Sequence, residues 1–224
     1  AGLEAALRLK DQYGAEVTVV TMGLPKAEEV LREAMAMGAD NGVLVTDRVL
    51  GGADTWATSQ TIAGALRNLD YDLIITGRQA IDGDTAQVGP QIAEKLHLPQ
   101  VTYAGEIKKE GNTFIVKRML EDGYMTVKVN TPCMITCIKE LNQPRYLSVG
   151  GAFEAYSKPL VTMTYETLKD HPLIDATTIG LKGSPTNILT SFTPPQKGAG
   201  MMLEGAGKET TDKLAGILAA KHII

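Results

Sequence analysis

The sequence has little cysteine and histidine, which limits the metal and redox chemistry open to its side chains. Cys133 and Cys137 lie four residues apart in one apolar stretch, and His97, His171 and His222 are scattered singly. A structural zinc site usually takes four Cys or His ligands grouped in space. We therefore interpret both cysteines as core thiols of a protein in a reducing compartment, and we predict no metal site.

The sequence also lacks an excess of positive charge and has few aromatic residues. Its 22 Lys and Arg are outnumbered by 26 Asp and Glu, and it has one Trp, three Phe and seven Tyr. Nucleic-acid binding needs a basic surface, often with stacking aromatics, so we predict no nucleic-acid partner. No apolar run approaches the roughly 18 residues of a membrane span. The first residues resemble neither a signal peptide nor a transit peptide.

Common catalytic and nucleotide motifs are missing as well. The sequence has no G-x-G-x-x-G after a strand, no G-x-x-x-x-G-K-[ST], no G-x-S-x-G and no H-E-x-x-H. None of the three histidines has an evident orienting partner, which a catalytic histidine needs. We therefore predict no catalytic residue and a site that binds a ligand rather than cleaving one.

The first part of the chain alternates helices and strands, judged from the spacing of its apolar residues. We predict helices over residues 1–12, 26–37 and 55–68, the last capped by Asp54 or Thr55, and strands over residues 16–21, 42–46 and 73–76. This alternation is typical of a mainly parallel sheet with helices on both faces. The predicted fold class is α/β with a Rossmann-like sheet. Because such a sheet normally opens with a strand, we expect that a leading strand is missing here.

After His97 the pattern changes to short strands that alternate in polarity. The stretches Val101–Ala104, Thr113–Arg118 and Tyr124–Val129 are separated by glycine-containing turns. They predict an antiparallel extension at one edge of the sheet. The apolar run Pro132–Ile138 can return to the sheet interior.

The C-terminal part is rich in glycine and proline between residues 180 and 207, and an amphipathic helix follows over residues 208–221. A segment of this length and composition does not fit inside a compact core. We predict an α/β nucleotide-binding domain over residues 1–182 and an extended arm with a C-terminal helix over residues 183–224. We expect the helix to dock on a partner subunit, and folding back on its own domain is the alternative.

The loop after the predicted strand 73–76 is the strongest candidate for a binding site. It is long for a strand-to-helix connection, and Gly77 and Gly83 permit backbone angles closed to other residues. Asp84 or Thr85 is the predicted N-cap of the next helix, whose free amides then face the strand end. Many α/β proteins bind phosphate at this place. A capped turn without a ligand is the alternative.

A second piece of the predicted site follows the strand 16–21, at Met22 and Gly23. The carboxyl ends of parallel strands share one edge of a sheet, where ligands bind. Asp82 and Asp84 fit poorly beside a phosphate, although Arg78, the loop amides and the helix N-terminus can offset their charge. A carboxylate can also accept hydrogen bonds from ribose hydroxyls. The sequence therefore predicts a nucleotide-sized site.

Four blocks of the sequence resemble the electron transfer flavoprotein β subunit. They are Ala34–Asp40, Gly77–Pro90, Asn142–Tyr146 and Gly180–Thr186, in the same order as in that family. The resemblance implies a heterodimer with an α subunit that carries FAD, acting as an electron carrier rather than a stand-alone enzyme. It implies the bacterial cytoplasm rather than the mitochondrial matrix. Members usually begin with a further strand and loop that also touch the nucleotide, and we expect that these are missing here.

In that family the β subunit binds either AMP or a second FAD, and with FAD the heterodimer can bifurcate electrons from NADH. The form of Ile81–Gly89 is more similar to the bifurcating type, so we expect FAD, with AMP as the alternative. The flavin would supply the chemistry and the protein its position and local charge. The cofactor-binding residues implied by the resemblance are Met22, Gly23, Gly77, Arg78, Gln79, Ala80, Ile81, Asp82, Gly83, Asp84, Thr85, Ala86, Gln87 and Val88.

The segment Arg145–Glu154 resembles the recognition loop of the family, which anchors an acyl-CoA dehydrogenase or another flavin dehydrogenase. Val149 stands where the family carries a leucine. We predict docking through Arg145, Val149 and Phe153, because an exposed apolar side chain on a mobile loop suits transient contact. An ordinary surface turn is the alternative. The alternative function is a stand-alone adenine-nucleotide-binding regulatory module of universal-stress type.

Overall fold

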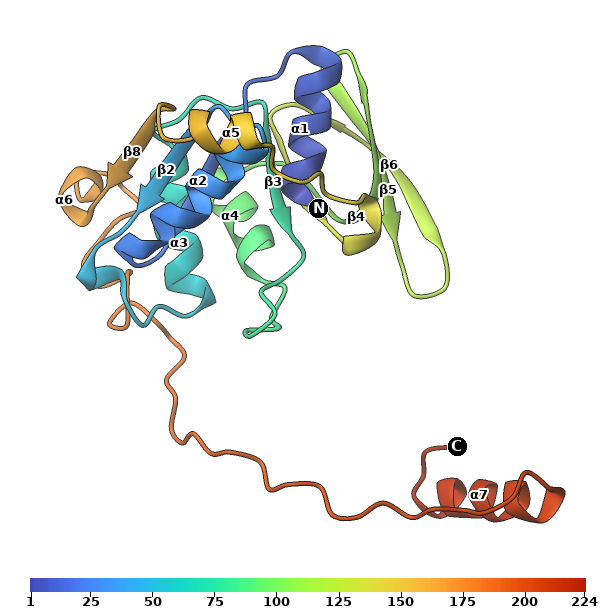
Figure 1. Ribbon diagram of the computed structural model, residues 1–224. Helices are drawn as coiled ribbons and strands as arrows, with labels where there is room; N and C mark the ends of the chain where they lie inside the picture. The colour runs from blue at the N-terminus through green and yellow to red at the C-terminus, as the bar shows by residue number, and fades with distance from the viewer. The chain divides into compact units, whose positions relative to one another are not determined.

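The strands fall into two sheets in the computed structural model, which describes residues 1–224 (Figure 1). The smaller sheet is parallel and has the order β1-β2-β8, with strands Thr18–Met22, Asn41–Val45 and Leu160–Met163. The larger sheet has the order β3-β7-β4-β5-β6, with strands Leu73–Gly77, Cys133–Cys137, Gln100–Glu110, Thr113–Met119 and Tyr124–Asn130. In it β3, β7 and β4 are parallel, whereas β5 and β6 are antiparallel additions. The predicted Rossmann-like α/β class with an antiparallel extension is confirmed.

Helices cover both faces of the larger sheet. On one face α3 (Thr55–Leu66) and α4 (Val88–Leu96) pack against Ile74 of β3. On the other face Leu9 of α1 (Gly2–Tyr13) packs against a cluster that includes Ile75. Because successive side chains of a strand point to opposite faces, neighbouring residues of β3 contribute to two separate cores.

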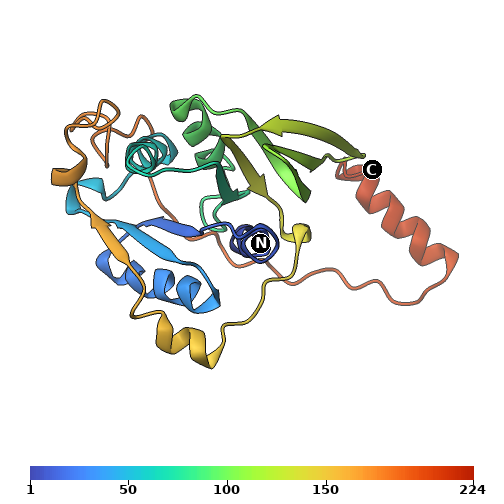
Figure 2. The same cartoon turned by 90° about the horizontal axis from the view of Figure 1, so that it is seen from above.

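The smaller sheet is covered in the same way. Met35 of α2 (Glu28–Met37) packs with Ala155, which directly follows α5 (Val149–Glu154). Val43 of β2 packs on the opposite face in a cluster with Leu168 of α6 (Tyr165–Leu168). Figure 2 shows α3 and α4 on one side of the sheets and α2 with α5 on the other.

The two sheets adjoin at β1 and β3, which are not hydrogen-bonded to each other. Val20 of β1 and Ile74 of β3 nevertheless belong to one apolar cluster. On the opposite side α1 contacts both sheets, because Leu7 packs against Val17 just before β1, while Leu9 packs beside β3. The helices therefore hold together two sheets that share no strand.

Several boundaries differ from the sequence prediction. Helix α4 begins at Val88 with Gln87 as its N-cap, so the prediction of Asp84 or Thr85 as the cap is wrong. The reason is that Asp84 has a φ of 46°, in the left-handed region that a helix N-cap does not use. The prediction contained neither β8 nor the short helices α5 and α6, because four to six residues are too few to show a period.

The segment before the arm is fastened to the first turn of α3. Asp54 caps that helix by accepting a hydrogen bond from Ala57 N at 3.0 Å, as predicted, and it also accepts one from Thr186 N at 3.0 Å. In return Asp54 N donates to Ser184 Oγ at 2.8 Å. The first compact unit comprises Ala1–Asn187.

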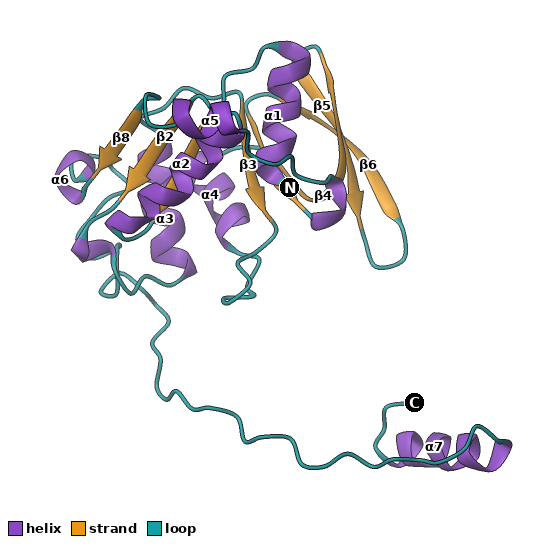
Figure 3. Cartoon of the chain, in the orientation of Figure 1, coloured by secondary structure: helices purple, strands orange, loops and turns teal.

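The second unit comprises Ile188–Ile224. It is a long segment without regular structure, followed by α7 (Lys208–Ala220), as the colouring of Figure 3 shows. None of its side chains is buried, and Leu189, Phe192 and Met202 are among the most exposed apolar residues of the chain. No helix of either unit has the length and apolar content of a membrane span.

Candidate functional site

The loop between β3 and α4 is folded on itself by its own hydrogen bonds. Asp84 N donates to Ala80 O at 3.0 Å, and the Gln79 side-chain amide donates to the Asp84 carboxylate. Asp84 and Ala86 have φ angles of 46° and 52°. Left-handed backbone is uncommon for residues other than glycine, and it often occurs at functional sites. The loop therefore has a defined shape in spite of its exposure.

The N-terminus of α4 has no side-chain cap, so its first amides remain available to a ligand. Gln87, the N-cap residue, instead points its Oε1 at α3, where Thr55 Oγ1 donates to it at 2.8 Å. A second link between the helices runs from Ser59 Oγ to Gln91 Oε1 at 3.1 Å. The positive end of the helix dipole and these free N–H groups favour an anionic group.

Gly89 lets the first turn of α4 approach the end of β3 closely. A Cβ at this position would lie 2.8 Å from Thr76 Oγ1 and 2.9 Å from Thr136 Cγ2. The Thr76 hydroxyl is buried and has no hydrogen-bond partner. Gly89 lies within a block that the sequence singled out, whereas Thr76 and Thr55 were not among the predicted site residues. Only their positions could have indicated them. Thr76 lies near the end of β3, and Thr55 is the first residue of α3.

The predicted residues 77–88 lie together on this one loop, and most of their side chains are exposed. Ile81 is 96% exposed, and Arg78 Nε donates to Gln79 Oε1 at 3.0 Å. Met22 is the last residue of β1 and Gly23 follows it, and Gly23 N donates to Val45 O at 3.0 Å. Strand β1 is parallel to β2, and the arrows of β2 and β3 in Figure 1 point to the same edge. Neither a hydrogen bond nor an ion pair joins Met22 or Gly23 to the loop.

Trp56, the only tryptophan, lies in the first turn of α3 next to Thr55. It is 45% exposed, and Lys95 Nζ of α4 lies 3.3 Å from the centroid of its ring. Burial lowers the pKa of Lys95. The Trp56 indole therefore lies at the contact between α3 and α4, the two helices whose N-termini border the loop.

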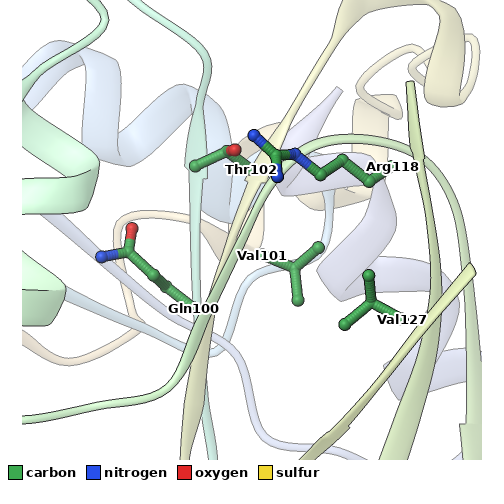
Figure 4. A pocket seen from close by; sticks show the side chains of 5 residues that line it. All are labelled: Gln100, Val101, Thr102, Arg118 and Val127. Atoms are coloured by element: carbon green, nitrogen blue, oxygen red, sulfur yellow. The ribbon is translucent and has the colours of Figure 1, made fainter. Parts of the chain in front are cut away.

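Most side chains at this edge are exposed to solvent. A hollow of about 330 Å³ does occur in the chain, but Gln100, Val101, Thr102, Arg118 and Val127 line it, on the antiparallel part of the larger sheet (Figure 4). None of the predicted cofactor residues contributes to it. The chain has no group of three or more His, Cys, Asp or Glu side chains placed to hold a metal ion.

The predicted docking residues differ in orientation. Val149 and Phe153 are 77% and 81% exposed on α5, which Ser148 caps by accepting a hydrogen bond from Gly151 N at 2.9 Å. Arg145 instead points to α1, where its Nε donates to Glu4 Oε2 at 2.9 Å. The structure thus separates the two apolar residues, which face solvent, from the arginine, which holds the segment to the fold.

The electron transfer flavoprotein domain family matches residues 1–167. The acryloyl-CoA reductase electron transfer subunit gamma of Anaerotignum propionicum is 60% identical, over 99% of this chain and 85% of the relative. The caffeyl-CoA reductase-Etf complex subunit CarD of Acetobacterium woodii is 51% identical, over 99% of this chain and 84% of the relative. The electron transfer flavoprotein subunit beta of Clostridium acetobutylicum is 50% identical over the same shares. The chain belongs to the electron transfer flavoprotein family.

Within that family the chain is of the β-subunit type, because relatives 48% and 50% identical to it bear the name electron transfer flavoprotein subunit beta. Membership of the family implies binding of a flavin-related cofactor. The family match leaves the universal-stress alternative without support.

Proposed function

We propose that the 77–88 loop, together with Met22 and Gly23, binds FAD in a bifurcating electron transfer flavoprotein heterodimer. The single observation that carries this proposal is the uncapped N-terminus of α4 above a loop with two left-handed non-glycine residues. Amides in this position can bind the pyrophosphate of a dinucleotide. The names of the relatives from A. propionicum and A. woodii, which are parts of CoA-ester reductase complexes, favour the bifurcating type over the AMP type.

The residues of the loop divide between the parts of a nucleotide by their chemistry. The first amides of α4 would hold phosphate oxygens at the positive end of the helix, and the Arg78 guanidinium would add charged hydrogen bonds to them. Gln79 already engages Asp84, so Asp82 is the carboxylate free to accept from a ribose hydroxyl. When bound, the flavin would supply the redox chemistry, and these side chains would hold it in place.

The proposed α-subunit contact is the arm and helix of the predicted second segment, residues 183–224. Its exposed apolar side chains include Leu189, Phe192, Met202 and Leu214. An exposed apolar surface of this kind is typical of a segment that is covered by another chain. Folding back of the arm on its own domain is the outcome that would oppose this assignment.

The proposed docking partner is an acyl-CoA dehydrogenase or a similar flavin enzyme, bound through Val149 and Phe153 in the bacterial cytoplasm. Tyr146 and Tyr156 are 97% and 76% exposed beside them. Four large apolar or aromatic side chains on one short surface segment match the aromatic-rich centre of many protein interfaces.

The cofactor content of the purified heterodimer tests the proposal. The chain is co-expressed with its α subunit, and FAD and AMP are quantified after denaturation. We expect two FAD per heterodimer, and one of them should be lost in a Thr85→Phe or Gln87→Phe variant. Lys128→Phe, on the exposed surface of β6, is the matched control and should keep both. One FAD with one AMP would show a conventional AMP site and exclude bifurcation.

A further inference from the structure

The segment that carries the exposed apolar residues is fastened at both ends. We call residues 145–158 the docking segment. At its first end Glu4, only 3% exposed, accepts hydrogen bonds from Arg145 N at 3.1 Å and Arg145 Nε at 2.9 Å. Arg145 Nη2 donates to Asp11 Oδ2 at 2.7 Å. One arginine therefore joins the start of the segment to two turns of α1.

The second end is fastened to α2 by two further cations. Arg32 Nη1 donates to the carbonyl oxygens of Ala155 at 2.8 Å and Lys158 at 3.1 Å. Lys158 Nζ donates to Met35 O at 2.9 Å and to Ala39 O at 2.8 Å. The carbonyls at the C-terminus of a helix lack partners within it, and a lysine is a favourable donor to them.

Between these attachments α5 rests directly on α2. A Cβ at Gly151 would lie 2.2 Å from Ala36 O, so only glycine allows this approach. Ala155 is 1% exposed on the same inner side, whereas Val149 and Phe153 point outward. The inner face of the segment is thus fixed by polar and backbone contacts, and the outer face is left free and apolar.

We propose that Glu4 is a positioning residue, which acts through Arg145 to hold the docking segment in the conformation that binds the partner dehydrogenase. This inference rests on the proposed docking function of Val149 and Phe153. Fixing a binding surface before association removes part of the ordering cost of the complex, so it strengthens binding without adding a contact. Glu4 lies on the inner side of the segment, away from its apolar outer face.

Two variants, made in the intact heterodimer, loosen the segment from opposite sides. Glu4→Gln weakens the attachment to α1, and Gly151→Ala pushes α5 away from α2. Backbone amide hydrogen exchange of residues 146–156 is measured, together with the KM for the heterodimer in electron transfer to purified A. propionicum acryloyl-CoA reductase. Glu166→Gln on α6 is the control, because this carboxylate pairs only with Lys169, the C-cap of that helix.

Both variants should accelerate exchange in the segment and raise KM about tenfold, the factor that corresponds to one lost charged hydrogen bond. The kcat and the flavin content should stay unchanged, which a general loss of folding would not allow. If Glu4→Gln does not fold, the hydrogen exchange and the KM of Gly151→Ala decide whether the docking segment must be fixed in place. Unchanged exchange and KM in the folded variants would overturn the positioning role.

A separate pair of variants keeps the two proposals distinguishable. Val149→Asp and Phe153→Asp place charge on the outer face and should raise KM without faster exchange. If they leave KM unchanged, the docking function itself is wrong. If they raise it while Glu4→Gln and Gly151→Ala do not, docking stands and the positioning role of Glu4 is wrong.

Discussion

Glu4 is a buried carboxylate whose charge depends on two arginines. Burial alone raises the pKa of Glu4, but hydrogen bonds from Arg145 and then Arg8 outweigh it, so the pKa falls from 4.5 to about 2. A carboxylate with a lowered folded-state pKa contributes stability above its unfolded pKa and loses it as the pH falls through the folded value. The contribution of Glu4 is therefore complete near neutral pH and is lost between about pH 5 and pH 2.

We predict that Glu4→Gln lowers the free energy of unfolding by about 2–3 kcal/mol at pH 7, the scale set by a carboxylate whose pKa folding lowers by about two units. The difference from the parent chain should shrink steadily below about pH 5, because the parent loses the same interaction by protonation. Urea unfolding of both chains at a series of pH values measures this. A stability difference between the two chains that stays constant down to pH 3 would contradict the lowered pKa of Glu4.

The two cysteines are a second case in which burial sets the chemistry of single residues. Burial raises the pKa of Cys133 to about 11 and that of Cys137 to about 12. Both side chains lie in the core of the larger sheet, 0% and 3% exposed. The thiolate is the reactive form, so these thiols are inert in the folded protein.

We predict that a thiol reagent such as dithiobis-nitrobenzoate reacts with the folded chain at pH 8 at least about a hundredfold more slowly than with the urea-unfolded chain. The absorbance of the released thiolate gives both rates. Rapid labelling of either Cys133 or Cys137 under native conditions would show that β7 opens or that the core is wrongly described.

Helix α4 is the element on which the candidate site depends, and its position depends on Gly89. A methyl group there would collide with Thr76 at the end of β3 and with Thr136 on β7. We predict that Gly89→Ala lowers the stability of the first unit by about 1–3 kcal/mol, the usual range for overpacking, and reduces the nucleotide content of the heterodimer. Thermal unfolding and cofactor quantification measure the two effects.

A matched control in the first unit is Gly123→Ala between β5 and β6, where an added Cβ meets no atom within 4 Å. This substitution should be neutral or slightly stabilising, because alanine lowers the conformational entropy of the unfolded chain. If Gly89→Ala behaved like the control in both measurements, close contact between α4 and β3 would not be needed for the site.

The sequence predicted those elements in which one local signal dominates. Asp54 was identified as a possible cap of α3, and the apolar run around Cys133 as an inner strand, because capping and continuous burial are local properties. The start of α4 was placed too early, since Asp84 forms a turn with Gln79 instead of capping the helix. Local preference cannot distinguish these two uses of an aspartate.

The same limit applies to the candidate docking site. Val149 and Phe153 were predicted as exposed, and they are exposed. The inward orientation of Arg145 depends on Glu4, which lies 141 residues earlier in the chain. No periodicity or motif links two residues so far apart, so this contact required the folded structure.

At the scale of the whole molecule, the chain presents two surfaces on one compact unit and a third on the arm. The 77–88 loop lies at the carboxyl edge of the strands, and the docking segment lies over α2 with its first end on α1. Helix α1 contacts the larger sheet as well, where a Cβ on Gly2 would lie 3.2 Å from Ile75 Cγ2. The 77–88 loop and the docking segment are therefore both attached to helices that pack into the core of the first unit.

The second unit, Ile188–Ile224, contributes no buried side chain, so we expect the first unit to fold without it. A chain truncated after Asn187 should unfold cooperatively, within about 2 °C of the full-length chain, because its core loses no contact. It should not form a stable heterodimer with the α subunit, since the exposed apolar residues proposed to bind that subunit are removed. Calorimetry of the isolated chain and sedimentation of its mixture with the α subunit measure the two properties. A truncated chain that still sedimented as a heterodimer would place the main α-subunit interface on the first unit instead of the arm.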